Sequence, residues 1–171
     1  YYFSVNDLEN SYVHLDANIS LLEEDSTTFK NRPNVYFSLL TNIIYVSTRL
    51  KKYEEAQDFL SRLKNLSTRK QQRTLDLDIK YFSSSCSLEL FLLIEKGDYH
   101  KAEQLVPQIE EAYRLYGDSI NSLRKAYIDF KVGIIYLSLG EYSKALTWIN
   151  KVLNESKIDQ KQEIFCFAQL I

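Results

Sequence analysis

The chain repeats one short sequence three times, and a weaker fourth copy precedes them. Each clear copy combines a tyrosine with an acidic neighbour and an alanine three positions after the tyrosine. The repeated position recurs at Leu8, Tyr53, Tyr99 and Tyr142. A period of roughly 45 residues is typical of a stacked array, in which each unit contacts only its neighbours. The repeat therefore predicts a solenoid rather than a closed globule.

The repeated sequence has the chemistry of a tight turn between two helices. Gly97 and Gly140 stand where glycine can adopt the left-handed conformation that ends a helix. The acidic residue after each glycine places an acceptor and a negative charge at the start of the next helix. Lys51 occupies the glycine position in the copy around Tyr53, so we expect that turn to be less sharp or strained.

The tyrosine and the alanine of each copy are expected to hold the two helices together. A tyrosine can fill the space between the helices. The alanine three positions later lies on the same helical face, where its small size permits a close approach. We therefore predict that Ala102 and Ala145 are almost fully buried.

These turns resemble those of the tetratricopeptide repeat (TPR) family, whose helix-turn-helix units carry a Gly-Asp-Tyr-x-x-Ala type of turn. The resemblance implies an all-α fold, a TPR-like α-solenoid in which antiparallel helix pairs form a right-handed superhelix. It covers residues 1–171 as a single helical repeat domain of about three and a half repeats. The units are longer than the family's, which have about 34 residues, and the family's proline between repeats is missing. The matching positions are Ala56, Ala102, Ala145, Gly133, Tyr136, Leu60, Val106 and Ile149.

Apolar periodicity and turn residues predict where the helices lie. Ala102, Leu105, Val106, Ile109 and Ala112 form one stripe of the 3.6-residue period, for example. A proline at position 107 is expected to kink that helix one turn earlier. The expected helices are 7–24, 33–50, 53–66, 71–96, 99–116, 119–139, 142–155 and 159–171.

The two ends of the sequence predict a fragment of a larger protein. The chain contains no methionine, its first residues read as the tail of a helix, and its last residues form an apolar helical pattern without a stop signal. An array normally needs polar capping repeats. We therefore expect Tyr1, Phe3, Phe165 and Phe167 to be exposed or covered by another chain, so that the fragment can form a homo-oligomer through its uncapped ends.

Composition argues against several classes of function. The net charge is −2 and the sequence pI about 5.8, which does not favour nucleic acid or an anionic membrane. No apolar run approaches the roughly 18 residues that a membrane-spanning helix needs, and no signal peptide is visible, so we expect a cytoplasmic protein. The basic cluster Arg69–Arg73 is interpreted as a solvated turn rather than a site for an anionic partner.

No residue pattern predicts catalysis or a bound cofactor or metal. Cys86 and Cys166 lie too far apart in sequence for a Cys-x-x-Cys site and are interpreted as buried, reduced packing residues. His14 and His100 are interpreted as structural histidines. The repeat offers no nucleophile, base and orienting group that converge, so we do not expect an enzyme.

The surface most informative about function is the concave groove. In the resembled family the first helices of successive repeats line it, and the aligned alanines identify the equivalent positions here. Its mixture of polar and aromatic side chains suits an extended peptide. Three apolar residues occupy equivalent positions of the first helices but are interpreted as packing residues, namely Phe91, Phe130 and Ile134. The predicted partner-binding residues are Ser38, Thr41, Asn42, Tyr45, Arg49, Ser84, Ser87, Glu95, Tyr127 and Ser138.

The sequence thus predicts a protein- or peptide-interaction module, a scaffold or sensing domain of a larger cytoplasmic protein. One alternative is the peptide-responsive regulatory domain of a transcriptional regulator, which an adjoining DNA-binding segment would reveal. A second is an RNA-binding helical repeat. The acidic pI argues against RNA, because such a repeat should present a basic face.

Overall fold

The computed structural model describes residues 7–24, 33–66, 74–117, 119–155 and 163–171. All regular structure in these residues is α-helical, and none of them forms a strand, which confirms the predicted all-α class. The helices divide into two compact units, Tyr1–Lys70 and Gln71–Ile171, each described by itself below. The interpretation of residues 1–171 as one continuous repeat domain stays a prediction.

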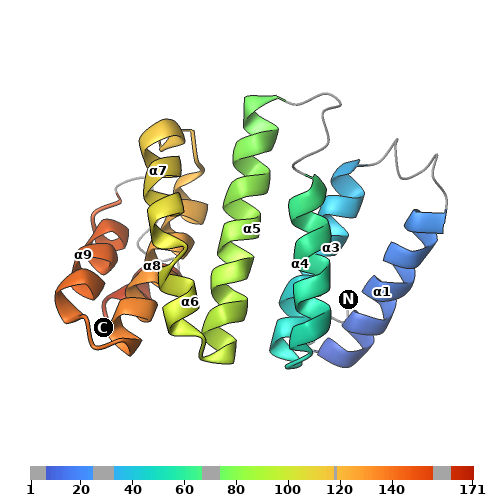
Figure 1. Cartoon of the computed structure of the whole chain (residues 1–171), viewed down its shortest axis with the longest axis horizontal. Coiled ribbons are helices and arrows are strands. Elements are labelled where there is room, and N and C mark those ends of the chain that lie inside the picture. Colours follow the sequence, from blue (N-terminus) through green and yellow to red (C-terminus); the bar gives the residue numbers. More distant parts are fainter. Residues whose placement is uncertain (1–6, 25–32, 67–73, 118, 156–162) are drawn as a thin grey trace. The chain divides into compact units, whose positions relative to one another are not determined.

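The first unit is a three-helix layer of α1 (Leu8–Glu24), α3 (Pro33–Arg49) and α4 (Tyr53–Leu66). Helix α3 packs against both of the others (Figure 1). Its side chains at Leu40, Ile43 and Ile44 are fully buried, as are Leu60 and Leu63 of α4. Apolar residues at spacings of three and four therefore form the core, as the helical period requires.

A polar network joins the three helices of this unit. The hydroxyl of Tyr36 on α3 donates a hydrogen bond to the carboxylate of Glu23 on α1. Arg62 on α4 lies 3.3 Å from the same carboxylate and 2.6 Å from Asp58 on its own helix. The network fixes the C-terminal end of α1 beside α3 and α4.

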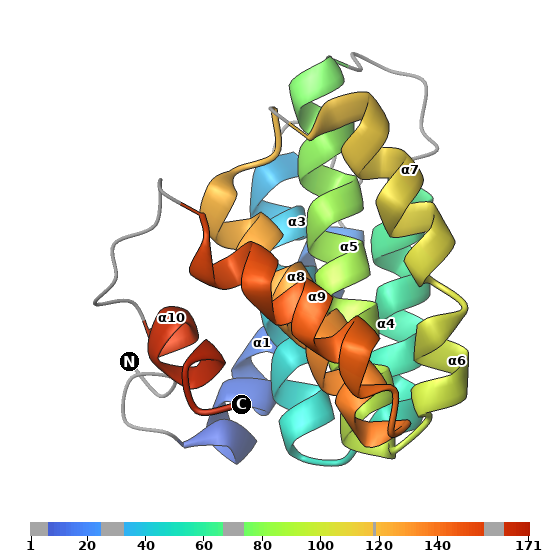
Figure 2. The ribbon, with the colours of Figure 1, turned by 90° about the vertical axis from the view of Figure 1, so that its left-hand side faces the viewer.

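The second unit is organised around α8. It contains α5 (Leu75–Lys96), α6 (Tyr99–Glu103), α7 (Val106–Tyr116), α8 (Ser122–Ser138), α9 (Tyr142–Leu153) and α10 (Glu163–Ala168) (Figures 1 and 2). Helix α8 contacts α5, α6, α9 and α10. The main core cluster draws on five helices and includes Leu90, Ala102, Val106, Ile128, Val132, Ile135, Ala145 and Trp148.

The three turns between the helices of a pair share one hydrogen-bonding pattern. Gly97 and Gly140 both have φ of 75°, which confirms the predicted left-handed caps. After the first, the N–H of Asp98 donates to the carbonyl of Leu93 at 2.9 Å. In the same way, the N–H groups of Lys52 and Glu141 donate to the carbonyls of Ser47 and Tyr136, five residues earlier in the chain. This is the Schellman arrangement that ends many helices.

The lysine-containing turn is as tight as the glycine turns. Lys51 adopts φ of 61° and its N–H donates to the carbonyl of Thr48 at 3.0 Å, so the prediction of a less sharp turn is wrong. The alternative prediction of strain is consistent with a side chain in the left-handed region. Local hydrogen bonds, from the N–H groups of Lys51 and Lys52 to the carbonyls of Thr48 and Ser47, accompany a conformation that glycine would adopt at lower cost.

Replacing Lys51 by glycine is therefore expected to stabilise the protein by about 1 kcal/mol. Replacing Gly97 by alanine should destabilise it by a similar amount. A Cβ atom at Gly97 would meet nothing within 4 Å, so the second change tests backbone conformation alone. Urea denaturation followed by circular dichroism measures both. A Lys51→Gly variant less stable than the parent would contradict the strain.

Most helix boundaries agree with the sequence, and the exceptions follow from local caps. Helix α5 begins at Leu75 rather than 71, because the side chain of Thr74 accepts a hydrogen bond from the N–H of Leu77. Helix α8 begins at Ser122 rather than 119, because Asn121 caps it in the same way. The helix expected at 99–116 is broken between Glu103 and Val106, as the proline at 107 predicted.

The alanine predictions are confirmed, whereas the tyrosine prediction holds only in part. Ala102 and Ala145 are almost fully buried. Tyr99 packs against the main core where α6 meets α5 and α8. Tyr142 is 69% exposed, so its predicted role as a filler between helices is wrong. Helix α9 packs mainly against α8, and its first residue stays in solvent.

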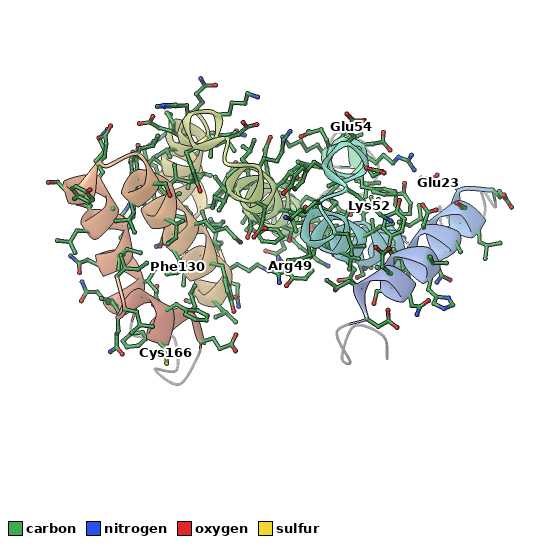
Figure 3. The ribbon with its side chains drawn as sticks, turned by 90° about the horizontal axis from the view of Figure 1, so that it is seen from below. Glu23, Arg49, Lys52, Glu54, Phe130 and Cys166 are labelled. Atoms are coloured by element: carbon green, nitrogen blue, oxygen red, sulfur yellow. The ribbon has the colours of Figure 1, made fainter. Side chains whose placement is uncertain are left out.

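The end of the chain corrects two further predictions. Phe165 is buried, with 8% of its surface exposed, because α10 turns it and Ile164 toward α8 and α9. Cys166 and Phe167 lie on the opposite side of the helix and are exposed, so the buried interpretation of Cys166 is wrong (Figure 3). Cys86 is buried as predicted. The residues Tyr1, Phe3 and Arg69–Arg73 lie outside the described residues.

The described helices include none that is both long and apolar enough to cross a membrane.

Candidate ligand-binding faces

Helix α3 carries half of the predicted binding residues on one side. Ser38, Asn42, Tyr45 and Arg49 are exposed and Thr41 is half-buried. The four exposed residues are spaced by four, three and four positions, which places them along a single stripe of the helix. The opposite side of the helix supplies the buried core of the first unit. We call these five residues the α3 face.

The polar groups of the α3 face differ in what they offer a ligand. The hydroxyl of Ser38 donates to the carbonyl of Asn34 at 2.9 Å, and that of Thr41 donates to the carbonyl of Ser38 at 2.9 Å. The donor capacity of both hydroxyls is therefore used within the helix. Asn42 and Arg49 extend farther from the backbone, so the amide and the guanidinium are the stronger candidates for ligand contacts.

Figure 3 shows the two sides of the α3–α4 pair. Arg49 lies on the α3 side, and Glu54 projects from the side of α4 that faces away from α3. Both residues are exposed. A matched pair of surface positions, one on the predicted binding side and one on the other, is thus available in the same unit.

In the second unit α5 and α8 form the corresponding surface. Ser84 and Ser87 of α5 are half-buried, and Tyr127 of α8 is 38% exposed. Glu95 and Ser138 are exposed at the C-terminal ends of their helices. The predicted residues therefore include a central group and two positions near the helix ends.

Lys131 connects the central group, and sequence reasoning missed it. Its ammonium lies 2.6 Å from the hydroxyl oxygen of Ser87 on α5 and 5.7 Å from the centre of the Tyr127 ring. Burial lowers the pKa of Lys131 to about 8. We call Ser84, Ser87, Tyr127 and Lys131 the α5–α8 face. A signal was present in the sequence, because Lys131 lies four residues after Tyr127 on the same helical side.

The packing interpretation of Phe130 is supported. Its ring is half-buried against the cluster of Ala126, Ile149, Val152 and Ile164, and it lies 6.5 Å from the ring of Phe167. Phe91 and Ile134 are half-buried as well. These three residues contribute apolar surface but are not needed to explain the polar contacts of either face.

A second unpredicted feature is a buried carboxylate. Asp129 on α8 is 2% exposed, and its Oδ1 atom has no hydrogen-bond partner among the described residues. Burial raises its pKa to about 6, although the nearby hydroxyl of Tyr113 and the charges of Lys151 and Lys125 oppose the shift. Lys151 in turn lies 3.2 Å from the centre of the Trp148 ring. Because Asp129 is buried where α8 meets Tyr113 of α7 and Lys151 of α9, it bears on stability rather than on ligand contact.

The described residues hold no group of three or more His, Cys, Asp or Glu side chains that could bind a metal ion. His14 and His100 are both exposed. The two cysteines lie in different environments, since Cys86 is buried in the core of the second unit and Cys166 is on the surface of α10.

Comparisons with protein-family models, with curated proteins and with solved structures find no match for this chain. Its function is therefore argued from the two faces.

Proposed function

We propose that this chain is a protein- or peptide-interaction module, a scaffold or sensing domain within a larger cytoplasmic protein. In this proposal its helix pairs belong to a TPR-like solenoid, and the ligand lies on the side formed by the first helix of each pair. An extended peptide would hydrogen-bond to Asn42 and Arg49 and place an apolar side chain against Tyr45.

The observation that carries the proposal is the contrast between the two sides of α3. One side is fully buried through Leu40, Ile43 and Ile44. The other presents Asn42, Tyr45 and Arg49 in one exposed stripe, with Tyr45 37% exposed. Packing within the unit does not require an amide and a guanidinium at the exposed positions of Asn42 and Arg49. Aromatic and arginine side chains are also the residues that most often dominate binding energy at interfaces.

The test compares binding and folding in one double variant. The full-length protein is used to capture its partner, and the affinity of the isolated partner is then measured by calorimetry. Replacing Asn42 and Arg49 together by alanine should weaken binding about tenfold or more. The circular-dichroism spectrum and the melting temperature should change little, because both side chains are exposed.

The matched control is Glu54→Ala, which removes an exposed charge from the other side of the α3–α4 pair. This variant should bind like the parent. If the double variant keeps full affinity while changes at Glu55 of α4 or Lys144 of α9 abolish binding, the second helices rather than the first form the working surface.

A further inference from the structure

Lys131 occupies the same place in its repeat as Asn42. Both residues stand eleven positions before the tyrosine of their turn, at Tyr142 and Tyr53 respectively. Each therefore lies on the first helix of a helix pair, at a position that the proposed function assigns to ligand contact. At this repeat position the α3 face presents the neutral amide of Asn42, and the α5–α8 face presents the cationic ammonium of Lys131.

The ammonium of Lys131 is half-buried and has a neutral neighbour in place of an acid. Its hydrogen bond goes to the hydroxyl of Ser87, and the ring of Tyr127 lies one turn earlier on the same helix. Removing a charge from water is costly unless an opposite charge compensates for it. The lowered pKa of Lys131 reflects that cost.

Four other lysines of the described residues pair with carboxylates. Lys52 pairs with Glu9, Lys96 and Lys101 both pair with Asp98, and Lys144 pairs with Glu103 and Glu141. Lys131 forms no ion pair with any acid in the described part of the chain, although it is less exposed than Lys96, Lys101 and Lys144. No carboxylate among the described residues therefore supplies the anion that this position favours.

We propose that Lys131 and Ser87 form a subsite that receives a side-chain carboxylate, from an Asp or Glu residue of the bound peptide. The inference rests on the proposed function and names the chemistry of its ligand. The carboxylate accepts a hydrogen bond from the ammonium of Lys131 and one from the hydroxyl of Ser87, while the ring of Tyr127 covers the adjoining apolar part of the acidic side chain. Charge-assisted hydrogen bonds of this kind are the stronger ones in proteins.

A carboxylate fits this subsite better than the phosphate backbone of a nucleic acid. Nucleic-acid binding draws on many basic side chains that together neutralise several phosphates. Here one ammonium and one hydroxyl converge, and the chain as a whole carries a net charge of −2. The donor set matches one carboxylate with two oxygens.

The principal experiment uses two synthetic peptide pools that differ only in whether the central side chain ends in a carboxylate or in an amide. Both are acetylated and amidated nonapeptides with a fixed central residue, Glu in one pool and Gln in the other, and random flanking residues. The parent protein should retain the Glu pool about tenfold more strongly than the Gln pool, the factor expected for one charge-assisted hydrogen bond. Lys131→Met should lose this preference, and Lys131→Arg should keep most of it.

Lys101→Met is the matched control, because it removes an exposed lysine of α6 that already pairs with Asp98. It should keep the preference for the Glu pool. If Lys131→Met also keeps the preference, or if the parent retains both pools equally, the subsite is refuted while a peptide-binding function stands.

A second probe separates the subsite from the proposed function. Nitrogen-15 and carbon-13 resonances of lysine side chains report the ionisation of Lys131 during titration with glutarate or with its neutral analogue glutaramide. Glutarate alone should raise the pKa of Lys131 toward the ordinary lysine value. If neither peptide pool binds but glutarate has this effect, the peptide function fails and the anion subsite stands. If glutarate has no effect, the subsite fails too.

Discussion

The variant Asp129→Asn is expected to gain stability relative to the parent as the pH rises from 4 to 7. The pKa of Asp129 is about 6 in the folded protein, against an ordinary value of 3.8. Between these values the folded state keeps a proton that the unfolded state has released, so the stability of the parent falls with rising pH. The difference between the two pKa values corresponds to roughly 3 kcal/mol, and the loss is complete above about pH 6.

Asparagine has a similar shape and no charge to bury, so the variant should escape that loss. Urea denaturation at several pH values measures the difference, with the fluorescence of Trp148 as the signal. This residue is the only tryptophan of the chain and lies in the core cluster of the same unit. The stability gap should widen by up to roughly 3 kcal/mol between pH 4 and 7.

Glu110→Gln provides the control, since it removes an exposed carboxylate from α7 in the same unit. Its effect should stay within about 0.5 kcal/mol throughout the pH range. A gap between Asp129→Asn and the parent that does not change with pH would show that Asp129 ionises normally in the folded protein.

The second large effect is expected at the contact between α8 and α9. Ala145 of α9 is 2% exposed. A Cβ atom built on Gly133 of α8 would lie 2.5 Å from Cδ1 of Ile149, which shows how closely the two helices approach. Ala145→Leu should therefore cost roughly 1 to 3 kcal/mol by overpacking. The same fluorescence-monitored denaturation measures the loss, because Trp148 lies one turn away on α9.

Asn150→Leu introduces the same side chain at an exposed position of α9 and serves as the control. Its stability should differ from that of the parent by no more than about 0.5 kcal/mol. An Ala145→Leu variant with the parent's denaturation midpoint would mean that the helices can separate at this point without cost.

Features that depend on residues close in sequence were predictable. The turns at Gly97 and Gly140, the break before the proline at 107 and the bounds of α4 all follow from backbone preferences and short-range periodicity. The α3 face was also identifiable as one stripe, because a regular helix determines which of its residues share a side.

Features that depend on two helices meeting were less accessible. The hydrogen bond between Ser87 and Lys131 joins residues of α5 and α8. No rule based on neighbouring residues in the sequence predicts that the side chain of Lys131 is half-buried. Asp129 is similar, since the groups that act on its carboxylate include Tyr113 of α7 and Lys151 of α9. The repeat register could have drawn attention to Lys131 but not to the environment that lowers its pKa.

By itself the sequence determined that this protein is all-helical and where its tight turns lie, because helix caps, left-handed residues and apolar period act over a few residues. Only the tertiary structure decided that Lys51 accepts a left-handed conformation, that Tyr142 and Cys166 are exposed, and that Phe165 is buried. Solvent exposure is a property of the surroundings. A side chain is buried when another helix covers it, and the free energy of that packing can outweigh a local preference of about 1 kcal/mol.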